Sequence, residues 1–202
     1  MTLRDMHMRI CFFGDSIVNG TGDPDCLGWV GRVCAAARQG GVDLTSYNLG
    51  IRRDASADIL GRWRREAELR LPAEHPRRLV FSFGVNDCIQ ENGACRVPGA
   101  QTISNARAIL GTAAAYAPTL MIGPAPIAEA EVNARVQELI PALRAVCHAL
   151  GVPFLDVFDR LEASSIWMRE IAEGDGAHPS RHGYEALAAL VNGWAEWRAW
   201  LG

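Results

Sequence analysis

Hydrophobic residues in this chain gather in five short runs, each bounded by polar or glycine-containing segments. Several of these runs are apolar throughout rather than alternating, as is typical of strands covered on both faces of a parallel sheet. The pattern predicts strands over Met8–Phe13, Leu44–Leu49, Arg78–Phe83, Leu120–Gly123 and Pro153–Phe158.

Longer segments between these runs carry apolar residues three and four positions apart, which predicts helices. The fourth helix should end before Gly151, and Pro141 is expected to bend it. Ser180 is the expected N-cap of the last one. The predicted helices cover Trp29–Arg38, Ala55–Leu71, Ile103–Tyr116, Glu129–Leu150 and Arg181–Trp200.

Strands that alternate with helices predict one α/β domain over residues 1–202, a three-layer α/β/α sandwich around a flavodoxin-like five-stranded parallel sheet. Ligands of such sheets bind beyond the carboxyl ends of the strands. Ser16, Gly50 and Asn86 each lie at or shortly after the end of a predicted strand, and Asp175 and His178 precede the last helix. We expect these segments to meet at one edge of the sheet.

The composition is that of an ordinary globular protein, with 49% hydrophobic and 21% charged residues. A net charge of −3 gives no sign of the basic surface that nucleic-acid binding needs. No apolar run approaches the roughly 20 residues of a membrane helix, and Met1–Arg9 lacks the apolar stretch of a signal peptide. We therefore expect a cytoplasmic protein, with its six cysteines reduced.

All 20 basic residues are arginine, and the absence of lysine excludes several kinds of chemistry. An intact P-loop, a Ser-Lys dyad, a Schiff base and a pyridoxal enzyme all need the lysine amine. We expect no cofactor and no bound metal.

A Gly-Asp-Ser turn after the first strand places Ser16 where its hydroxyl could act as a nucleophile. Acyl transfer by serine also needs a base and donors for the oxyanion. His178 is the candidate base, and Asp175 is placed to orient it. The backbone N–H groups of Ser16 and Gly50 and the side-chain amide of Asn86 are the candidate oxyanion donors.

These four segments, in this order, resemble the sequence blocks of the GDSL lipases and esterases, also called the SGNH hydrolase superfamily. The Phe-Gly-Asp-Ser block ends at Ser16, which corresponds to the family nucleophile. Gly50, in Asn-Leu-Gly-Ile, and Asn86, in Gly-x-Asn-Asp, correspond to the oxyanion donors. Asp175 and His178, in Asp-x-x-His-Pro, complete the triad. The resemblance implies a serine esterase that hydrolyses small or lipid-like carboxylic esters, or alternatively an acetyl-sugar esterase or thioesterase.

The sequence departs from the family pattern at two positions. Ile17 replaces the leucine of the family name, a conservative change that should face the core. Arg53 stands where many relatives have glycine, so the loop after Gly50 could be shaped differently. The Gly-x-Ser-x-Gly elbow of α/β-hydrolases is absent, because Val18 is the second residue after the serine.

Two other classes of function remain open at this stage. Asp175, His178 and His182 are metal-ligand types at close spacing, which would suit a metal-dependent hydrolase, although Pro179 separates the histidines. A non-catalytic carbohydrate- or acyl-binding module on the same fold is the second alternative. 

Two further segments could shape the substrate site. Arg52 and Arg53 could meet an anionic part of a substrate, or could belong to a solvated arginine-rich face. The loop Ile89–Pro98 could border the acyl pocket or act as a lid.

Overall fold

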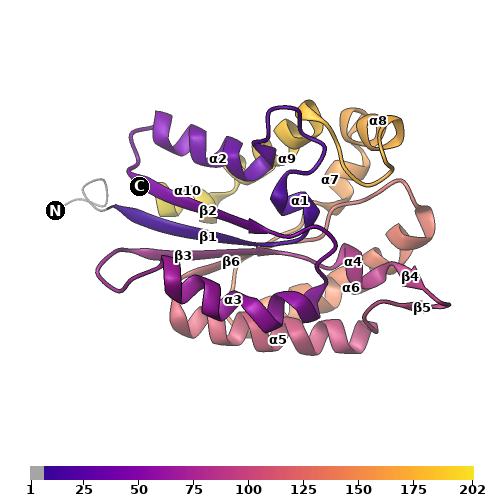
Figure 1. Ribbon diagram of the computed structural model, residues 1–202, viewed down its shortest axis with the longest axis horizontal. Coiled ribbons are helices and arrows are strands. Elements are labelled where there is room, and N and C mark those ends of the chain that lie inside the picture. Colours follow the sequence, from indigo (N-terminus) through magenta and orange to yellow (C-terminus); the bar gives the residue numbers. More distant parts are fainter. Residues whose placement is uncertain (1–6) are drawn as a thin grey trace.

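The computed structural model describes residues 7–202, and at its centre lies a five-stranded parallel sheet with helices on both faces (Figure 1). The strand order is β2-β1-β3-β6-β7. The strands are β1 Met8–Gly14, β2 Leu44–Gly50, β3 Arg77–Ser82, β6 Thr119–Ile122 and β7 Phe154–Leu155. The predicted fold class is confirmed. Part of the Met1–Arg9 segment, residues 1–6, lies outside the described residues, so the prediction of one domain over 1–202 stays a prediction.

The register of the central strands brings their carboxyl ends to the same level. Gly14 at the end of β1 is opposite Gly50 of β2 on one side and Ser82 of β3 on the other. In Figure 1 these strands point toward the end of the molecule where α1 (Ser16–Asn19) and α4 (Val85–Cys88) lie. The segments that follow the three strands therefore leave the sheet side by side.

Strand β1 is buried along almost its whole length because helices cover both of its faces. Successive side chains of a strand point to opposite faces. Phe12 accordingly meets Trp29 edge-on at 5.6 Å between ring centroids, whereas Phe13 stacks on Phe81 at 5.3 Å. Each phenylalanine belongs to a separate core cluster, and the two clusters hold the sheet between the helical layers.

The helical layers divide between the two core clusters. One face of the sheet is covered by α2 Gly28–Gln39, α8 Ser165–Glu173, α9 Arg181–Gly193 and α10 Ala195–Leu201. The other face is covered by α3 Ser56–Arg70, α5 Gly99–Tyr116 and α6 Ala130–Ala149, and Pro141 lies within α6 without ending it. None of the helices in the described range is both long and apolar enough to cross a membrane.

The structure corrects the predicted ends of two elements. The last strand is only Phe154–Leu155, because α7 (Phe158–Glu162) begins early and the Phe158 N–H donates to the Asp156 carboxylate at 3.1 Å. The last helix is two helices, because Trp194 takes extended backbone angles directly after Gly193. The spacing of apolar residues did not reveal this break, because apolar positions continue across it.

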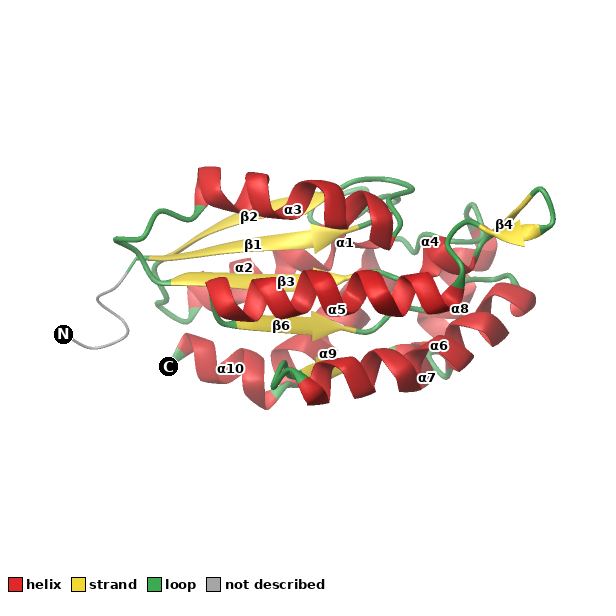
Figure 2. Cartoon of the chain, turned by 90° about the horizontal axis from the view of Figure 1, so that it is seen from below, coloured by secondary structure: helices red, strands yellow, loops and turns green. Residues whose placement is uncertain are grey.

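A short β-hairpin, which we did not predict, follows α4. It consists of β4 Gln90–Glu91 and β5 Ala94–Cys95, and it projects beyond the body of the molecule at the carboxyl end of the sheet (Figure 2). The segment predicted as a border or lid of the acyl pocket is therefore an ordered hairpin. Two-residue strands are too short to produce a readable alternation.

Candidate active site

Ser16 occupies the first turn of helix α1, directly beyond β1. Asp15 caps this helix, since its Oδ1 accepts the Ile17 N–H at 2.9 Å. Gly20 ends it after one turn with a φ of 87°, which glycine adopts without strain. The tight cap at each end fixes the serine at the edge of the sheet, with the neighbouring Ile17 side chain in the core as predicted.

Asp175 and His178 lie in the segment between α8 and α9. The Asp175 Oδ1 accepts the backbone N–H groups of Ala177 and His178, each at 3.0 Å, so the carboxylate organises its own turn. Its Oδ2 lies 2.6 Å from His178 Nδ1, and His178 Nε2 lies 2.6 Å from Ser16 Oγ. Ser16 thus joins two residues about 160 positions further along the sequence in one continuous chain of hydrogen bonds.

The charge on Asp175 fixes the direction of these hydrogen bonds. Burial alone would raise its pKa, but the hydrogen bonds from the His178 ring and from the backbone N–H groups outweigh burial and lower the pKa to about 2. Asp175 is therefore an anion at neutral pH and accepts the Nδ1–H of the imidazole. That tautomer leaves His178 Nε2 free to accept the proton of the Ser16 hydroxyl.

Asn86 lies in α4, the single turn that follows β3. One of its amide hydrogens is donated to the Asp54 carbonyl at 3.0 Å, and this bond fixes the side chain at the edge of the same pocket as Ser16. An asparagine amide carries two donor hydrogens. The second remains available to a ligand in the pocket.

Gly50 lies at the end of β2, beside α1. A Cβ at this position would collide with the backbone nitrogen of Asn19 and lie 2.7 Å from the Asp15 carbonyl oxygen, so close packing against α1 requires glycine. Its N–H donates to the Asn48 Oδ1 at 3.0 Å. The structure thus gives Gly50 a packing role, and its N–H already has a partner.

A buried polar network lies beneath Asn86. The Asp87 carboxylate, which is fully buried, accepts hydrogen bonds from the Ser56 N–H at 3.0 Å, from the Ser56 hydroxyl, and from the Thr102 hydroxyl at 3.0 Å. Asn105 donates in turn to the Ser56 hydroxyl at 2.9 Å. The network ties α4 to α3 and α5. Sequence reasoning missed it, although polar residues on the inner faces of those helices could have signalled it.

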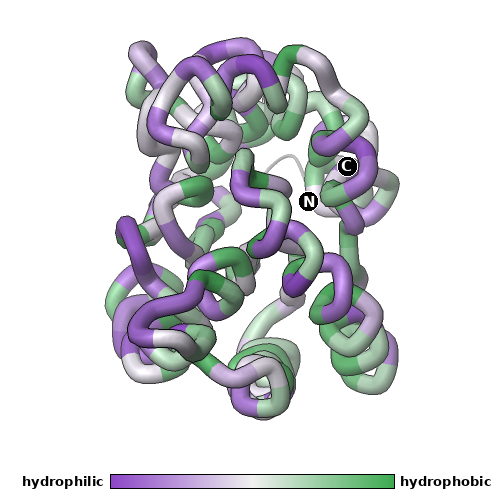
Figure 3. Tube along the Cα trace, turned by 90° about the vertical axis from the view of Figure 1, so that its right-hand side faces the viewer, coloured by the Kyte–Doolittle hydropathy of each residue, from purple (hydrophilic) through white to green (hydrophobic). Residues whose placement is uncertain are grey.

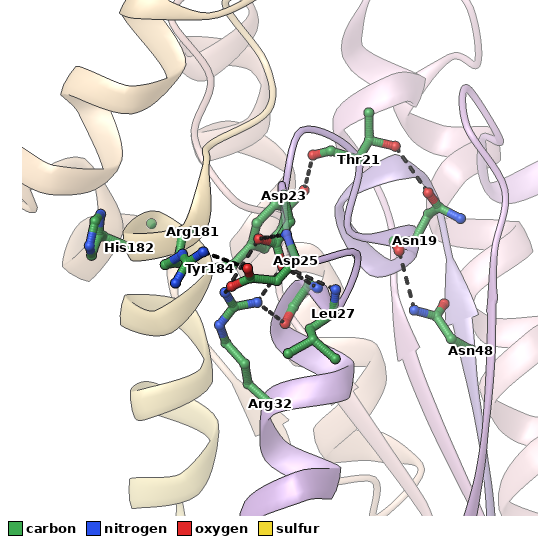
Figure 4. Close-up of polar contacts among 12 residues, drawn as sticks. Asn19, Thr21, Asp23, Asp25, Leu27, Arg32, Asn48, Arg181, His182 and Tyr184 are labelled. Atoms are coloured by element: carbon green, nitrogen blue, oxygen red, sulfur yellow. Dashed lines mark hydrogen bonds and ion pairs between the residues drawn. The ribbon is translucent and has the colours of Figure 1, made fainter.

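A second polar network secures the loop after α1 (Figure 4). The Asp23 carboxylate pairs with Arg32 of α2 and accepts the Gly28 N–H at 2.8 Å. The Tyr184 hydroxyl of α9 donates to the Thr21 carbonyl at 2.6 Å. Because a Cβ on Gly22 would come within 3.2 Å of the His178 Cβ, this loop packs directly on the catalytic histidine candidate. The loop that this network secures therefore forms one wall against His178.

His182 does not join the triad candidates. Its Nδ1 lies 3.1 Å from Glu170 of α8, whereas His178 faces Ser16, so the two histidines have different partners. Within residues 7–202 no group of three or more His, Cys, Asp or Glu side chains is arranged to hold a metal ion.

The triad candidates open into a pocket of about 200 Å³ at the carboxyl end of the sheet. Figure 3 views the molecule from this end, where hydrophilic and hydrophobic segments of the loops lie next to each other. Besides Ser16, His178 and Asn86, the pocket is lined by one acidic residue, two arginines and several apolar residues, namely Asp15, Arg52, Arg53, Ile17, Val85, Ile89, Ile127 and Ala177. A larger cavity of about 410 Å³ lies between the hairpin, α5 and α6, and Ser16 does not line it.

The sequence profile of the GDSL-like lipase/acylhydrolase family matches residues 12–186, which is most of the chain. The chain belongs to this family. As a family member it is a carboxylic ester hydrolase, and the family resemblance drawn from the four sequence blocks is confirmed. No curated protein matches the sequence.

Solved structures of similar proteins support the fold of this GDSL-family chain. A lipolytic protein of the G-D-S-L family from Veillonella parvula is 21% identical, with a TM-score of 0.76 and coverage of 92% of this chain and 96% of the other. A lipase/acylhydrolase from Enterococcus faecalis is 25% identical, with a TM-score of 0.75 and coverage of 91% and 93%. Axe2, an acetylxylan esterase from Geobacillus stearothermophilus, is 17% identical, with a TM-score of 0.73 and coverage of 93% and 95%.

Asp15 is buried beside the pocket, and its protonation should make the stability of the enzyme depend on pH. Burial raises its pKa from 3.8 to about 7, although the Ile17 N–H works in the opposite direction. Below pH 4 the residue is protonated in both the folded and the unfolded state. As the pH rises from 4 to 7, the unfolded chain loses this proton first, so the free energy of unfolding falls.

We expect Asp15→Asn to remove this loss, because asparagine stays neutral and keeps the acceptor for the Ile17 N–H. The free energy of unfolding of the variant minus that of the wild type should therefore increase by about 2–3 kcal/mol from pH 5 to pH 8. Urea denaturation at the two pH values measures this gain. An equal difference between variant and wild type at both pH values would contradict it.

Proposed function

We propose that the chain is a serine esterase that works through an acyl-enzyme on Ser16. The observation that carries this proposal is the unbroken chain from Ser16 Oγ to His178 Nε2 and from His178 Nδ1 to Asp175, with 2.6 Å at each step. These three residues act as nucleophile, general base and orienting acid.

In the first half of the proposed reaction, Ser16 Oγ attacks the ester carbonyl while His178 Nε2 takes up the hydroxyl proton. The resulting oxyanion accepts hydrogen bonds from the Ser16 N–H, which has no partner within α1, and from the second amide hydrogen of Asn86. The Gly50 N–H is the third donor and shares its hydrogen between Asn48 and the oxyanion. Collapse of the intermediate breaks the ester C–O bond, and His178 returns the proton to the departing alcohol.

In the second half, water attacks the acyl-Ser16 carbonyl while His178 again takes a proton. The carboxylic acid leaves and the serine hydroxyl is restored. Each half reaction moves one proton from nucleophile to leaving group, so the enzyme ends the cycle unchanged.

The size of the pocket indicates a small substrate. Its volume of about 200 Å³ is below the roughly 300–1,000 Å³ typical of sites for drug-sized ligands. Val85, Ile89, Ile127 and Ala177 form an apolar wall suited to a short acyl chain. We therefore propose short-chain carboxylic esters rather than lipid-like ones as substrates, which also agrees with a small acyl group on a sugar.

A labelling experiment with an ester panel tests this function. The wild type should hydrolyse p-nitrophenyl acetate and lose activity with growing acyl length, without sensitivity to a chelator. A fluorophosphonate should add one label to the Ser16 peptide by mass spectrometry and none to Ser16→Ala. Hydrolysis that chelator abolishes and zinc restores would favour a metal-dependent mechanism. A wild type inactive on carboxylic esters, thioesters and acetylated sugars would favour a binding module.

A further inference from the structure

Two arginines line the pocket in addition to the proposed catalytic residues. Arg52 and Arg53 occupy the loop after β2, and both residues line the pocket that contains Ser16 and His178. They lie in a turn closed by the Asp54 N–H, which donates to the Ile51 carbonyl at 3.2 Å. Arg53 is the third of the four residues of this turn.

The backbone of Arg53 keeps the conformation that glycine favours, with a φ of 71°. The third position of such a turn normally needs glycine or asparagine, because a Cβ is strained there. Packing does not require a side chain at this position, since the Arg53 side chain is 73% exposed. Strain of this kind is concentrated at functional sites. The arginine thus adopts a backbone conformation that its side chain disfavours, at the edge of the pocket.

The turn is fixed relative to the catalytic residues. Asp54 pairs with Arg62 Nε at 2.7 Å, and Arg62 also donates to the Leu49 carbonyl of β2 at 2.9 Å. The Asp54 carbonyl accepts the Asn86 amide at 3.0 Å. The turn that carries both arginines is therefore anchored to β2, α3 and α4, and a group that they bind is held at a set distance from the proposed oxyanion donors.

Two arginines and one acidic residue, Asp15, are among the residues that line the pocket. Arg53 pairs with Glu91 of the hairpin at 2.6 Å, and the same carboxylate also lies 3.5 Å from Arg96. No ion pair links Arg52 to an acidic side chain among residues 7–202. The Asp175 carboxylate is already engaged by His178. The arginines together therefore have unused capacity to bind an anion.

We propose that Arg52 and Arg53 bind a carboxylate of the substrate, so that the preferred substrates are small esters that carry a carboxylate on their acyl or alcohol part. The inference rests on the proposed esterase function and specifies the charge of the preferred substrate. Arginine suits the task because its planar guanidinium donates two parallel hydrogen bonds to a carboxylate. In the free enzyme Glu91 forms an ion pair with Arg53, and it therefore competes with the substrate carboxylate for the Arg53 guanidinium.

Matched pairs of esters test the inference. For a carboxylate on the alcohol part, p-acetoxybenzoate is compared with its neutral methyl ester. For one on the acyl part, monomethyl succinate is compared with dimethyl succinate. The readout is the ratio of kcat/KM for the anionic ester to that for the neutral ester. We expect a ratio of about 10 or more in at least one pair, which decreases in 0.5 M NaCl as the salt screens the charges.

The variants should change this ratio in opposite directions. Arg52→Gln and Arg53→Gln should each lower it about three- to fivefold, and Glu91→Gln should raise it about twofold by freeing Arg53. Arg107→Gln removes the same charge from an exposed position on α5 and should leave the ratio unchanged. Arg53→Gly removes the guanidinium and should therefore lower the ratio as well. Because glycine also relieves the backbone strain, the Tm of this variant should be no lower than that of the wild type.

The outcomes separate this inference from the proposed function. The carboxylate site would be overturned if the enzyme hydrolysed the anionic and the neutral esters with equal kcat/KM and if this ratio were unchanged in Arg52→Gln and Arg53→Gln. Efficient hydrolysis of the neutral esters would still support the proposed esterase. A wild type that hydrolyses none of these esters would overturn both.

Discussion

Replacement of His178 by alanine is expected to lower kcat/KM for p-nitrophenyl acetate by at least about 10³-fold. The imidazole is the base nearest to the Ser16 hydroxyl, at 2.6 Å, and without it the serine keeps its proton. Steady-state kinetics on the purified variant measures the loss. Ser16→Ala combined with His178→Ala should be no slower than either single variant, because residues that act as a unit lose their effect together.

His182→Ala is the matched control for this prediction. It removes the same side chain four residues later, from a position that is 63% exposed and paired with Glu170. Its kcat/KM should stay within about twofold of the wild type, as for surface substitutions away from the site. If His178→Ala kept a tenth of the wild-type activity, the proposed general base would be wrong.

Replacement of Asp87 by alanine is expected to lower the free energy of unfolding by about 3–5 kcal/mol. The variant leaves the N–H and the hydroxyl of Ser56 buried without their acceptor, and it leaves the Thr102 hydroxyl only the longer contact to the Pro98 carbonyl at 3.4 Å. Buried donors that lose their partner cost far more than the hydrogen bonds themselves contribute. Denaturant unfolding monitored by tryptophan fluorescence measures the change.

Two further substitutions provide reference values for the loss of stability in Asp87→Ala. Asp87→Asn keeps one acceptor oxygen and should cost about half as much. Asp43→Ala removes an exposed carboxylate directly before β2 and should change stability by less than about 0.5 kcal/mol. Because Asn86 precedes Asp87 in α4, folded Asp87→Ala protein should also lose esterase activity. Equal stability of Asp87→Ala and Asp43→Ala would show that the network contributes nothing.

Local patterns were sufficient to predict much of the fold. The apolar run of β1 and the helical stripe of α6 each follow from the period of side chains in one element, which the sequence shows directly. The prediction failed where an element spans only about one period, as in α1, α4 and the Gln90–Cys95 hairpin. It also failed at Trp194, where the backbone turns although the apolar spacing continues.

The candidate site was also predictable in part, because its residues carry chemistry that few other patterns explain. The structure places Ser16, His178 and Asp175 in contact as the order of strands suggested. Their catalytic roles stay predictions, as do the oxyanion donors. Gly50 illustrates the limit: its sequence block suggested an oxyanion donor, and only the structure shows its close packing against α1 and the hydrogen bond from its N–H to Asn48.

The sequence by itself determined the order along the chain of the five strands of the sheet and of the longest helices, the edge of the sheet at which the candidate site lies, and the family. These properties depend on side-chain period, on strand direction and on short motifs, all of which are local. Only the tertiary structure decided that Asp87 joins three helices, that Glu91 reaches Arg53, and that the arginine turn is anchored by Arg62. Such contacts join residues tens of positions apart, and their geometry arises when the helices and loops pack on the finished sheet.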